Sequence, residues 1–525
     1  MIDELHLDEL LNDEHLGAGN FIHKIHEKFY QGSDKKILSL IDNEACKKQD
    51  FSIQEIIETA RRIASSYEQT GVKPKEVVSL YFQDSIDYFL HFLALNSIGA
   101  IPALINGELN TDILLKFLHS VRPNHLVITP EKEAEITRVF AQANYRLPVH
   151  TIDALKTRQQ ATSRPFYSHE PQDVIMIGHT SGTTGIPKAV IFTHESMFHG
   201  VRSQVKKQKG DNILSILPHS HGASISLLML SFTRGAHVTI LSKKDPATII
   251  RAVRETRPNV VIAFPKVYVD LCRHTLNESD FQSISYWIAT GDASHEKHIR
   301  KLVSLGHHER DGQTVPGSFF VDNLGSSEFA FAIFRNVHSP QSDNYKRCIG
   351  KPFPWVDVAV FNEQGQYLQE NSVGRLAVKS KSVTQGYWNN HSLTEMNKID
   401  GYWLTGDLVY FDEKRNFYHV DRTNDSLSFN NVEIYSCQIE EAIIADINEV
   451  FEATVIMTDN NELIAYIELL DSCAVSKDEI TERINQLMRQ KNWPALSTVE
   501  FQSANEFIGV TGKKLKRQLR ELAHS

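Results

Sequence analysis

The feature that most constrains the fold is an alternation of short apolar segments with segments of helical periodicity. Residues 77–82, 125–129, 174–177 and 260–263 are largely apolar runs, and residues 53–67 carry apolar side chains at helical spacing. Strands that are apolar on both faces and alternate with helices favour a mostly parallel sheet with both faces covered. We therefore expect an α/β fold over most of the first 420 residues or so.

The chain has 525 residues, more than one hydrophobic core normally holds, so several domains are expected. Beyond about residue 350 the pattern changes. Residues 356–361 and 374–378 alternate in polarity around a turn-like segment, which is typical of antiparallel strands. The predicted fold class is α/β, with a large N-terminal domain of layered α/β subdomains and a small β-barrel-like part. A small α+β C-terminal domain follows.

Composition narrows the class of protein. Hydrophobic residues make up 41% and charged residues 23% of the chain, as in ordinary globular proteins. A net charge of −10 argues against nucleic acid as a partner. The five cysteines include no C-x-x-C pair, which favours free thiols in a reducing compartment. The acidic N-terminus is unlike a signal peptide, and no apolar run reaches the roughly 18 residues of a membrane span. We expect a soluble, cytoplasmic protein.

A loop directly after the apolar segment 174–177 carries the strongest functional signal. Its glycines allow close backbone approach, its hydroxyls can donate hydrogen bonds, and Lys188 adds a compact positive charge. Such a loop can surround phosphate oxygens. The spacing differs from the G-x-x-x-x-G-K-[ST] pattern of P-loop NTPases. The loop consists of Thr180, Ser181, Gly182, Thr183, Thr184, Gly185, Ile186, Pro187 and Lys188.

This loop resembles the phosphate-binding signature of the adenylate-forming (AMP-dependent synthetase and ligase) superfamily. That superfamily includes acyl- and aryl-CoA ligases, firefly-type luciferases and the adenylation domains of nonribosomal peptide synthetases. The resemblance covers about residues 25 to 520 and implies that ATP binds with its phosphates on the loop. Further segments resemble family motifs in the same order, namely residues 217–221, 290–294, 322–328, 402–407, 419–425 and 509–517.

The resemblance assigns roles around the phosphates and the adenine. His221 would border the carboxylate and the phosphate. Glu328 would hold Mg²⁺ against the phosphates, together with Thr184, because a hard cation prefers oxygen ligands. Two segments would line the adenine, with Leu324 in place of the usual aromatic residue. Their residues are Gly291, Asp292 and Ala293 on one side and Leu324, Gly325, Ser326 and Ser327 on the other.

The resemblance also assigns the ribose site, a lysine and a hinge. Asp407 would accept hydrogen bonds from both ribose hydroxyls, and Arg422 would reach the ribose or a phosphate. Lys513 would contact the carboxylate and the α-phosphate during adenylation. Asn424 stands at the family's hinge. The predicted domains are therefore residues 1–422, the adenylate-forming domain, and 423–525, a mobile lid.

The implied reaction has two steps. A carboxylate attacks the α-phosphate of ATP and expels pyrophosphate, and charge neutralisation and positioning should dominate because two anions must meet. A thiol then takes the acyl group, with CoA as the expected acceptor. Ser428 and Asn431 stand where many members have Lys and Gly. A carrier-protein phosphopantetheine is therefore the first alternative acceptor. A non-catalytic nucleotide-binding homologue is the alternative of another class.

The segment after His221 bears on the acid. Residues 222–228 contain no acidic side chain, whereas members that activate α-amino acids carry an aspartate there. Small residues at Gly222, Ala223, Gly291 and Gly325 would leave room for an aryl ring or an alkyl chain. We therefore expect an aryl or fatty acid rather than an α-amino acid, and we leave the particular acid, the pathway and the oligomeric state open.

Overall fold

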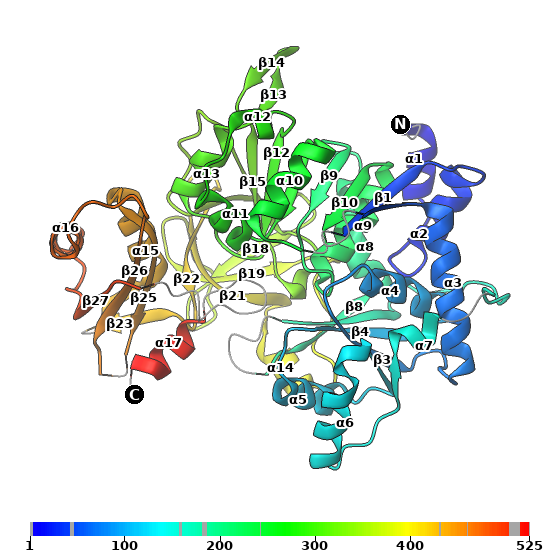
Figure 1. Ribbon diagram of the computed structural model, residues 1–525. Coiled ribbons are helices and arrows are strands. Elements are labelled where there is room, and N and C mark those ends of the chain that lie inside the picture. Colours follow the sequence, from blue (N-terminus) through cyan, green and yellow to red (C-terminus); the bar gives the residue numbers. More distant parts are fainter. Residues whose placement is uncertain are drawn as a thin grey trace. The chain divides into compact units, whose positions relative to one another are not determined.

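The computed structural model describes residues 4–42, 47–156, 160–180, 186–241, 243–429, 432–458, 460–502 and 515–523 of the chain. The chain forms two compact units (Figure 1). Unit 1 comprises Met1–Ala263, Gly325–Ala332 and Lys381–Met396, and unit 2 comprises Phe264–Leu324, Ile333–Ser380 and Asn397–Ser525. The division into units 1 and 2 reflects the compactness of each unit and does not test the domain boundary expected near Asn424. That boundary stays a prediction.

Unit 1 is built of helices and strands that alternate along much of the chain. They are α1 (Glu4–Leu11), α2 (Phe21–Ile25), η1 (His26–Tyr30), β1 (Lys36–Asp42), β2 (Lys47–Ser52), α3 (Ile53–Gln69), β3 (Val77–Phe82), α4 (Asp87–Ser97), β4 (Ile101–Asn106), α5 (Thr111–Val121), β5 (His125–Ile128), η2 (Pro130–Lys132), α6 (Glu133–Gln142), β6 (Val149–Thr151), α7 (Ile152–Lys156), β7 (Val174–His179), β8 (Ala189–Thr193), α8 (His194–Gln204), β9 (Asn212–Ser215), α9 (Gly222–Arg234), β10 (His237–Leu241), α10 (Pro246–Thr256), β11 (Val260–Ala263), η3 (Ser327–Phe329) and α14 (His391–Met396).

Two groups of parallel strands form the centre of unit 1. One sheet has the order β6-β5-β3-β4-β7-β8 and is parallel except for β8, which pairs antiparallel with β7. The other group runs β11-β9-β10-β1 in parallel and ends on the antiparallel β2. Every residue of β3 and β4 is buried, as expected for strands covered on both faces. The predicted parallel α/β architecture is confirmed.

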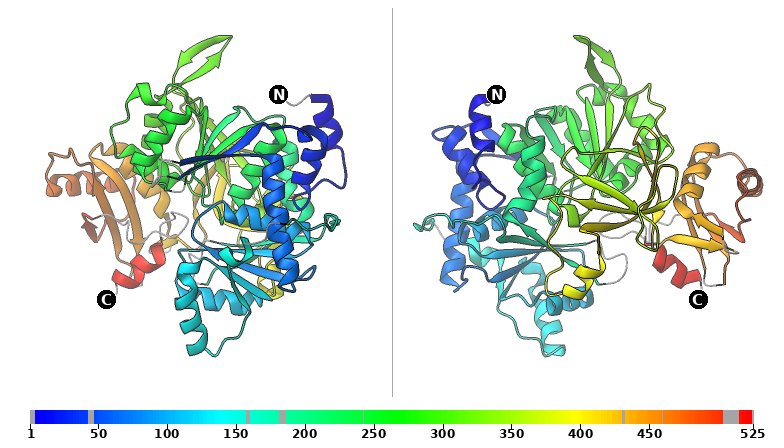
Figure 2. Two further views of the ribbon diagram at one scale, coloured as in Figure 1. Left: turned by 45° about the vertical axis from the view of Figure 1, so that its right-hand side comes forward. Right: turned by 180° about the vertical axis from the view of Figure 1, so that it is seen from behind.

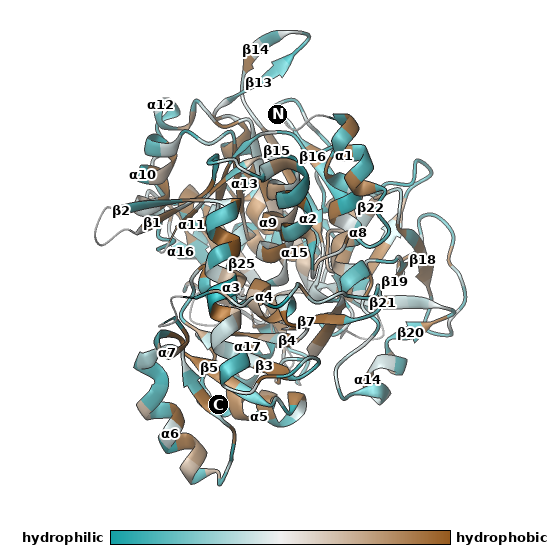
Figure 3. Cartoon of the chain, turned by 90° about the vertical axis from the view of Figure 1, so that its right-hand side faces the viewer, coloured by the Kyte–Doolittle hydropathy of each residue, from teal (hydrophilic) through white to brown (hydrophobic). Residues whose placement is uncertain are grey.

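Local sequence explains how the first long helix forms. Ser52 caps α3 by accepting a hydrogen bond from the amide of Glu55, and the Glu55 carboxylate accepts from the amide of Ser52. This capping box satisfies two amides that the helix itself leaves unpaired. The apolar positions at helical spacing, such as Ile56, Ala60 and Ile63, are buried. In Figure 3, α3 carries both hydrophilic and hydrophobic residues, whereas β4 and β7 are largely hydrophobic.

Unit 2 begins with an α/β part and continues into antiparallel strands. Its elements are α11 (Pro265–Cys272), α12 (Glu278–Phe281), β12 (Tyr286–Thr290), α13 (Glu296–Val303), β13 (His307–Arg310), β14 (Gln313–Pro316), β15 (Phe319–Leu324), β16 (Phe334–His338), β17 (Cys348–Pro352), β18 (Asp357–Phe361), β19 (Gly374–Lys379), β20 (Lys398–Ile399), β21 (Tyr402–Phe411), β22 (Phe417–Arg422), β23 (Ser426–Phe429), β24 (Val432–Tyr435), α15 (Ser436–Asp446), β25 (Val450–Met457), β26 (Leu463–Leu469), α16 (Lys477–Gln490), β27 (Thr498–Glu500) and α17 (Lys516–Ala523).

The strands of unit 2 divide as the sequence predicted. β12 and β15 are parallel, and β15-β16-β17-β22-β21-β19-β18 follow in antiparallel order. The last part is α+β, because β25-β26-β27 and the helices α15 and α16 share one apolar cluster. Figure 2 shows the β13–β14 hairpin projecting from this unit. Among the residues that the structure describes, no helix is both long and apolar enough to span a membrane.

Candidate functional site

The glycine- and hydroxyl-rich loop connects two antiparallel strands, β7 and β8. The Thr180 amide donates to the Lys188 carbonyl at 3.1 Å, and the Lys188 amide donates to the Thr180 hydroxyl at 3.1 Å. These bonds close the base of the loop. The interior residues Ser181, Gly182, Thr183, Thr184 and Gly185 lie outside the described residues, so their contacts with phosphate stay predictions.

A buried histidine at the end of β7 holds the base of this loop. His179 Nε2 accepts the Asn106 amide at 3.0 Å, so in the neutral ring Nδ1 carries the proton that is donated to the Thr180 carbonyl at 2.8 Å. Burial lowers the pKa of His179, which keeps the ring neutral. Sequence reasoning missed this residue because a single histidine in a chain with 24 gives no signal of its own.

The turn that carries Glu328 lies against the base of the loop. Ser327 donates its hydroxyl hydrogen to the His179 carbonyl at 3.4 Å. The Glu328 carboxylate accepts a hydrogen bond from the Tyr387 hydroxyl at 2.9 Å, and its backbone carbonyl accepts from the Thr384 amide at 2.7 Å. Unit 1 therefore brings the Thr180–Lys188 loop close to the carboxylate that is expected to bind the metal. Tyr387 and Thr384 were not among the predicted site residues.

A turn that contains His219 and His221 follows β9. The His219 amide and its Nδ1–H both donate to Asp84 Oδ1, at 2.6 and 2.9 Å. Lys244 pairs with the same carboxylate and donates to the Leu217 carbonyl at 2.9 Å. Burial alone would raise the pKa of Asp84, but the His219 hydrogen bond and the Lys244 charge hold it well below its usual range. Asp84 and Lys244 therefore fix the turn that presents the predicted His221.

His221 itself occupies the N-cap position of α9. Its Nδ1 accepts the Ala223 amide hydrogen at 3.1 Å. A neutral ring with an acceptor at Nδ1 carries its proton on Nε2. His221 Nε2 can thus donate a hydrogen bond to a carboxylate or phosphate oxygen, which agrees with the role implied by the resemblance.

In unit 2, Asp407 sits among cationic and imidazole groups. This carboxylate is 4% exposed, and its Oδ1 lies 3.1 Å from Arg422 Nη1 and 3.2 Å from His419 Nε2. Burial alone would raise the pKa of Asp407, but Arg422 and His419 lower it far below its usual range. Arg347 Nη2 donates to His419 Nδ1 at 2.9 Å, so the neutral ring must donate through Nε2 to Asp407. Asp407 is therefore an ionised acceptor suited to two ribose hydroxyls.

The predicted adenine segments follow neighbouring strands of unit 2. β12 and β15 are parallel and Thr290 pairs with Asn323, so Gly291–Ala293 and Leu324 lie at the carboxyl ends of both strands. Ligands of parallel α/β sheets commonly bind at this edge. Gly291 has φ of +93°, and a Cβ there would come within 3.0 Å of the Phe264 ring, which explains the need for glycine.

The structure thus groups the predicted residues within each unit. Unit 1 carries the loop, His221, Glu328 and the Gly325–Ser327 segment, and unit 2 carries Gly291–Ala293, Leu324, Asp407 and Arg422. Lys513 and Asn431 lie outside the described residues. The roles of all these residues stay predictions.

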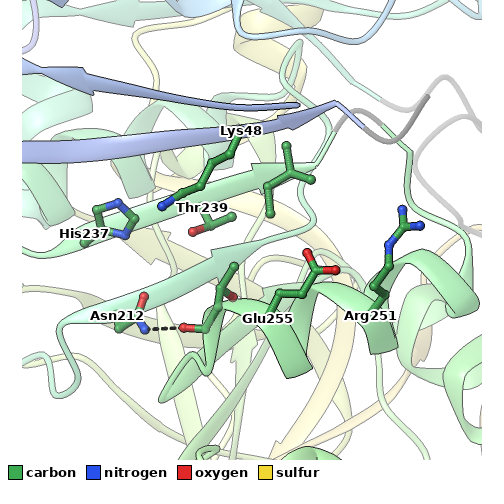
Figure 4. Close-up of a pocket in the computed structure, with 8 residues that line it drawn as sticks. Lys48, Asn212, His237, Thr239, Arg251 and Glu255 are labelled. Carbon is green, nitrogen blue, oxygen red and sulfur yellow. Dashed lines mark hydrogen bonds between the residues drawn. The ribbon is translucent and has the colours of Figure 1, made fainter. Parts of the chain in front are cut away.

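A separate pocket of about 480 Å³ lies elsewhere in unit 1 (Figure 4). None of the predicted site residues that the structure describes borders it. The pocket is therefore no part of the candidate site. It is lined by Ile41, Lys48, Asn212, His237, Thr239, Arg251, Glu255 and Thr256.

Comparison with known proteins decides the family. The model of the AMP-binding enzyme family matches residues 31–388. The chain belongs to this family. It is 32% identical to the 3-aminoavenalumate diazotase of a Streptomyces species, over 98% of this chain and 97% of the relative. It is 24% identical to a 4-coumarate–CoA ligase of Humulus lupulus, over 82% and 81% of the two chains.

Solved structures show the same fold. The ATP-bound MatB of Rhodopseudomonas palustris matches with a TM-score of 0.82 over 97% of this chain and 99% of that chain, at 19% identity. The predicted fold class, with its large N-terminal and small C-terminal domains, is confirmed. The predicted membership of the adenylate-forming superfamily is confirmed as well.

Proposed function

We propose that this enzyme uses Mg²⁺ and ATP to convert a carboxylic acid into its acyl-adenylate, with release of pyrophosphate. One observation carries the proposal. The Glu328 turn is hydrogen-bonded to the base of the Thr180–Lys188 loop through Ser327 and His179. A carboxylate placed beside a phosphate-binding loop is the arrangement that a metal-bound triphosphate requires.

The donor set fits Mg²⁺. Carboxylate oxygen from Glu328 and hydroxyl oxygen from Thr184 are hard ligands of the kind that this ion prefers, and these two residues would hold it. When bound, Mg²⁺ neutralises phosphate charge. The chain's own groups do the rest: Lys513 draws the substrate carboxylate to the α-phosphate, and His221 Nε2–H donates to an oxygen there. A carboxylate oxygen bonds to the α-phosphorus as the bond to the bridging oxygen of pyrophosphate breaks.

The second half-reaction transfers the acyl group to a thiol, CoA in our first proposal. The sulfur attacks the acyl carbon, AMP leaves and the thiol proton passes to solvent. A carrier-protein phosphopantetheine is the alternative thiol. Aryl or fatty acids remain the proposed substrates, because residues 222–228 offer no carboxylate to an α-amino group.

A second candidate function rests on the 32% identity with a diazotase over nearly the whole chain. Diazotisation joins an aryl amine to the nitrogen of an activated nitrite. Nitrite presents a bent pair of oxygens, as a carboxylate does, so the same site could adenylate it. The amine would then attack the nitroso nitrogen with loss of AMP, and the resulting nitrosamine would take up a proton and lose water to give the diazonium group.

A pyrophosphate-exchange screen tests these functions. The wild-type enzyme receives ATP, Mg²⁺ and aryl, short-chain, long-chain or β-amino acids, or nitrite with an aryl amine. We expect exchange with one acid class. Exchange with nitrite alone would replace that function by the second candidate, and ATP binding without exchange in every arm would contradict both.

Product analysis identifies the acceptor. CoA, a holo carrier protein or an aryl amine is added to the exchanging mixture, and the thioester or diazo product is measured. A thioester on the carrier and none on CoA would overturn CoA as the proposed acceptor.

Lys513→Ala should slow pyrophosphate exchange by about 100-fold or more. Exchange at the wild-type rate in this variant would refute the role of Lys513.

A further inference from the structure

Tyr387 is held beside the predicted phosphate loop by backbone pairing with β8. Tyr387 forms a bridge with Val190, and the Trp388 amide donates to the Ala189 carbonyl at 2.8 Å. The Ile191 amide donates to the Gly386 carbonyl at 3.1 Å. The tyrosine side chain is 4% exposed. The position of its ring is therefore determined by the strand that directly follows the loop.

The same side chain contacts two predicted site residues of opposite charge. Its hydroxyl donates to Glu328 Oε1 at 2.9 Å, and the Lys188 ammonium lies 5.3 Å from the centre of its ring. The distance to the ammonium is within the range of a cation–π interaction. Thr384, three residues earlier, holds the backbone carbonyl of Glu328. The segment 384–387 thus hydrogen-bonds both the backbone carbonyl and the carboxylate of Glu328.

We propose that Tyr387 is a positioning residue that orients the Glu328 carboxylate and the Lys188 ammonium for Mg²⁺ and ATP. The inference rests on the proposed function of this site. A carboxylate with one oxygen hydrogen-bonded to a fixed donor keeps a defined orientation toward the metal. The Tyr387 hydroxyl is the donor of this pair, because a carboxylate oxygen can only accept.

Calorimetric titration of the full-length enzyme with ATP, with and without Mg²⁺, tests the proposal. In wild type we expect Mg²⁺ to strengthen ATP binding. Tyr387→Phe should reduce this gain by about 10- to 100-fold, the usual effect of removing a hydrogen-bond partner of a metal ligand. Binding of ATP in EDTA should stay close to that of wild type. A variant that keeps the full Mg²⁺ gain would overturn the proposal.

Tyr367→Phe is the matched control. Tyr367 also donates its hydroxyl to a carboxylate, that of Asp400, but it is exposed and none of the predicted site residues is its partner in the described part of the chain. Its removal deletes the same chemical contact, so the Mg²⁺ gain should match wild type. An equal loss in both variants would show a general effect of tyrosine removal and contradict the assigned role.

A double-mutant cycle with Glu328→Gln separates positioning from general structure. If Tyr387 acts through Glu328, Tyr387→Phe should have little further effect on the Mg²⁺ gain in the Glu328→Gln background. An undiminished further loss would show that Tyr387 acts elsewhere and would overturn the inference. Failure of the proposed function looks different, because wild type itself would then show no acid- or nitrite-dependent exchange.

Discussion

At the scale of single residues, Asp407 shows how a buried carboxylate stays charged. Arg422 and His419 both face Oδ1, and their combined effect outweighs the burial that alone would raise its pKa. The carboxylate can therefore accept two hydrogen bonds without waiting for a proton to leave. This property suits the recognition of a ribose, whose two hydroxyls are both donors.

Asp407→Asn should weaken ATP binding by about 10- to 100-fold, because charge-assisted hydrogen bonds contribute about 1.5–3 kcal/mol each. The comparison of ATP with 2′-deoxy-ATP in a binding titration isolates the ribose contact. Wild type should prefer ATP, and the variant should lose most of that preference. A variant that still discriminates between the two nucleotides would contradict the assignment.

His221 combines a structural role with its predicted chemical role, and two substitutions separate them. His221→Asn supplies another N-cap side chain for α9, so the melting temperature should remain near that of wild type while pyrophosphate exchange falls at least about 10-fold. His221→Ala should lose exchange and in addition about 1 kcal/mol of stability. Full exchange activity in His221→Asn would limit this residue to capping.

At the scale of elements, the sequence predicted those parts of the site that lie next to one another in the chain. The loop after β7 and the Thr-Gly-Asp segment within β21 carry their residues in fixed order. Asp84, His179 and Tyr387 act through partners 135, 73 and 59 residues away. No local pattern marks such residues, because their significance arises only when segments far apart in the chain come into contact.

In the fold, too, the sequence predicted local features but not contacts between distant segments of the chain. Apolar runs and helical periodicity identified some elements of unit 1, namely the strands β3, β5, β7 and β11 and the helix α3, since burial leaves a clear pattern there. The membership of Gly325–Ala332 and Lys381–Met396 in unit 1 was not predicted. These segments join the rest of unit 1 through specific hydrogen bonds, such as the bond from the Trp388 amide to the Ala189 carbonyl and the bond from the Ser327 hydroxyl to the His179 carbonyl, which composition does not encode.

The helix α17 is held by a buried ion pair. Lys516 Nζ lies 2.8 Å from Glu440 Oε1 on α15 and donates to the Ser436 hydroxyl at 2.7 Å, and both charged side chains are almost fully buried. Lys516→Met should therefore cost about 3–5 kcal/mol locally, because Glu440 loses its partner. Hydrogen exchange of the α15 and α17 amides measures this loss. Lys516→Met with Glu440→Gln should recover most of the protection, and no recovery would contradict the ion-pair explanation.

At the scale of the whole molecule, buried histidines predict how stability depends on pH. Burial lowers the pKa of His91, His194 and His338 to about 4 in each case. The ordinary value, about 6.5, applies to the unfolded chain. Between these values the unfolded chain binds more protons, so the free energy of unfolding should fall as the pH is lowered from about 6.5 toward 4.

Urea unfolding at pH 7.5, 6.0 and 5.0 checks this dependence. Each fully buried histidine contributes a slope of up to about 1.4 kcal/mol per pH unit. His91→Gln should flatten the slope, because its ring is fully buried against the Tyr67 hydroxyl. His391→Gln, at a side chain 88% exposed, should leave the slope unchanged. A steeper loss of stability toward alkaline pH would contradict the sign.

The assembly of unit 1 from three stretches of chain has a consequence for how the protein is made. The Trp388 indole donates to the Val121 carbonyl across 267 residues, and Tyr387 donates to Glu328 across 59 residues, so contacts inside this unit join its distant stretches of chain. A ribosome must therefore release the chain as far as Met396 before unit 1 can close. Until then the pairing edge of β8 and the Glu328 turn lack the partners that residues 384–388 supply. A chaperone would bind the nascent chain in that incompletely folded form.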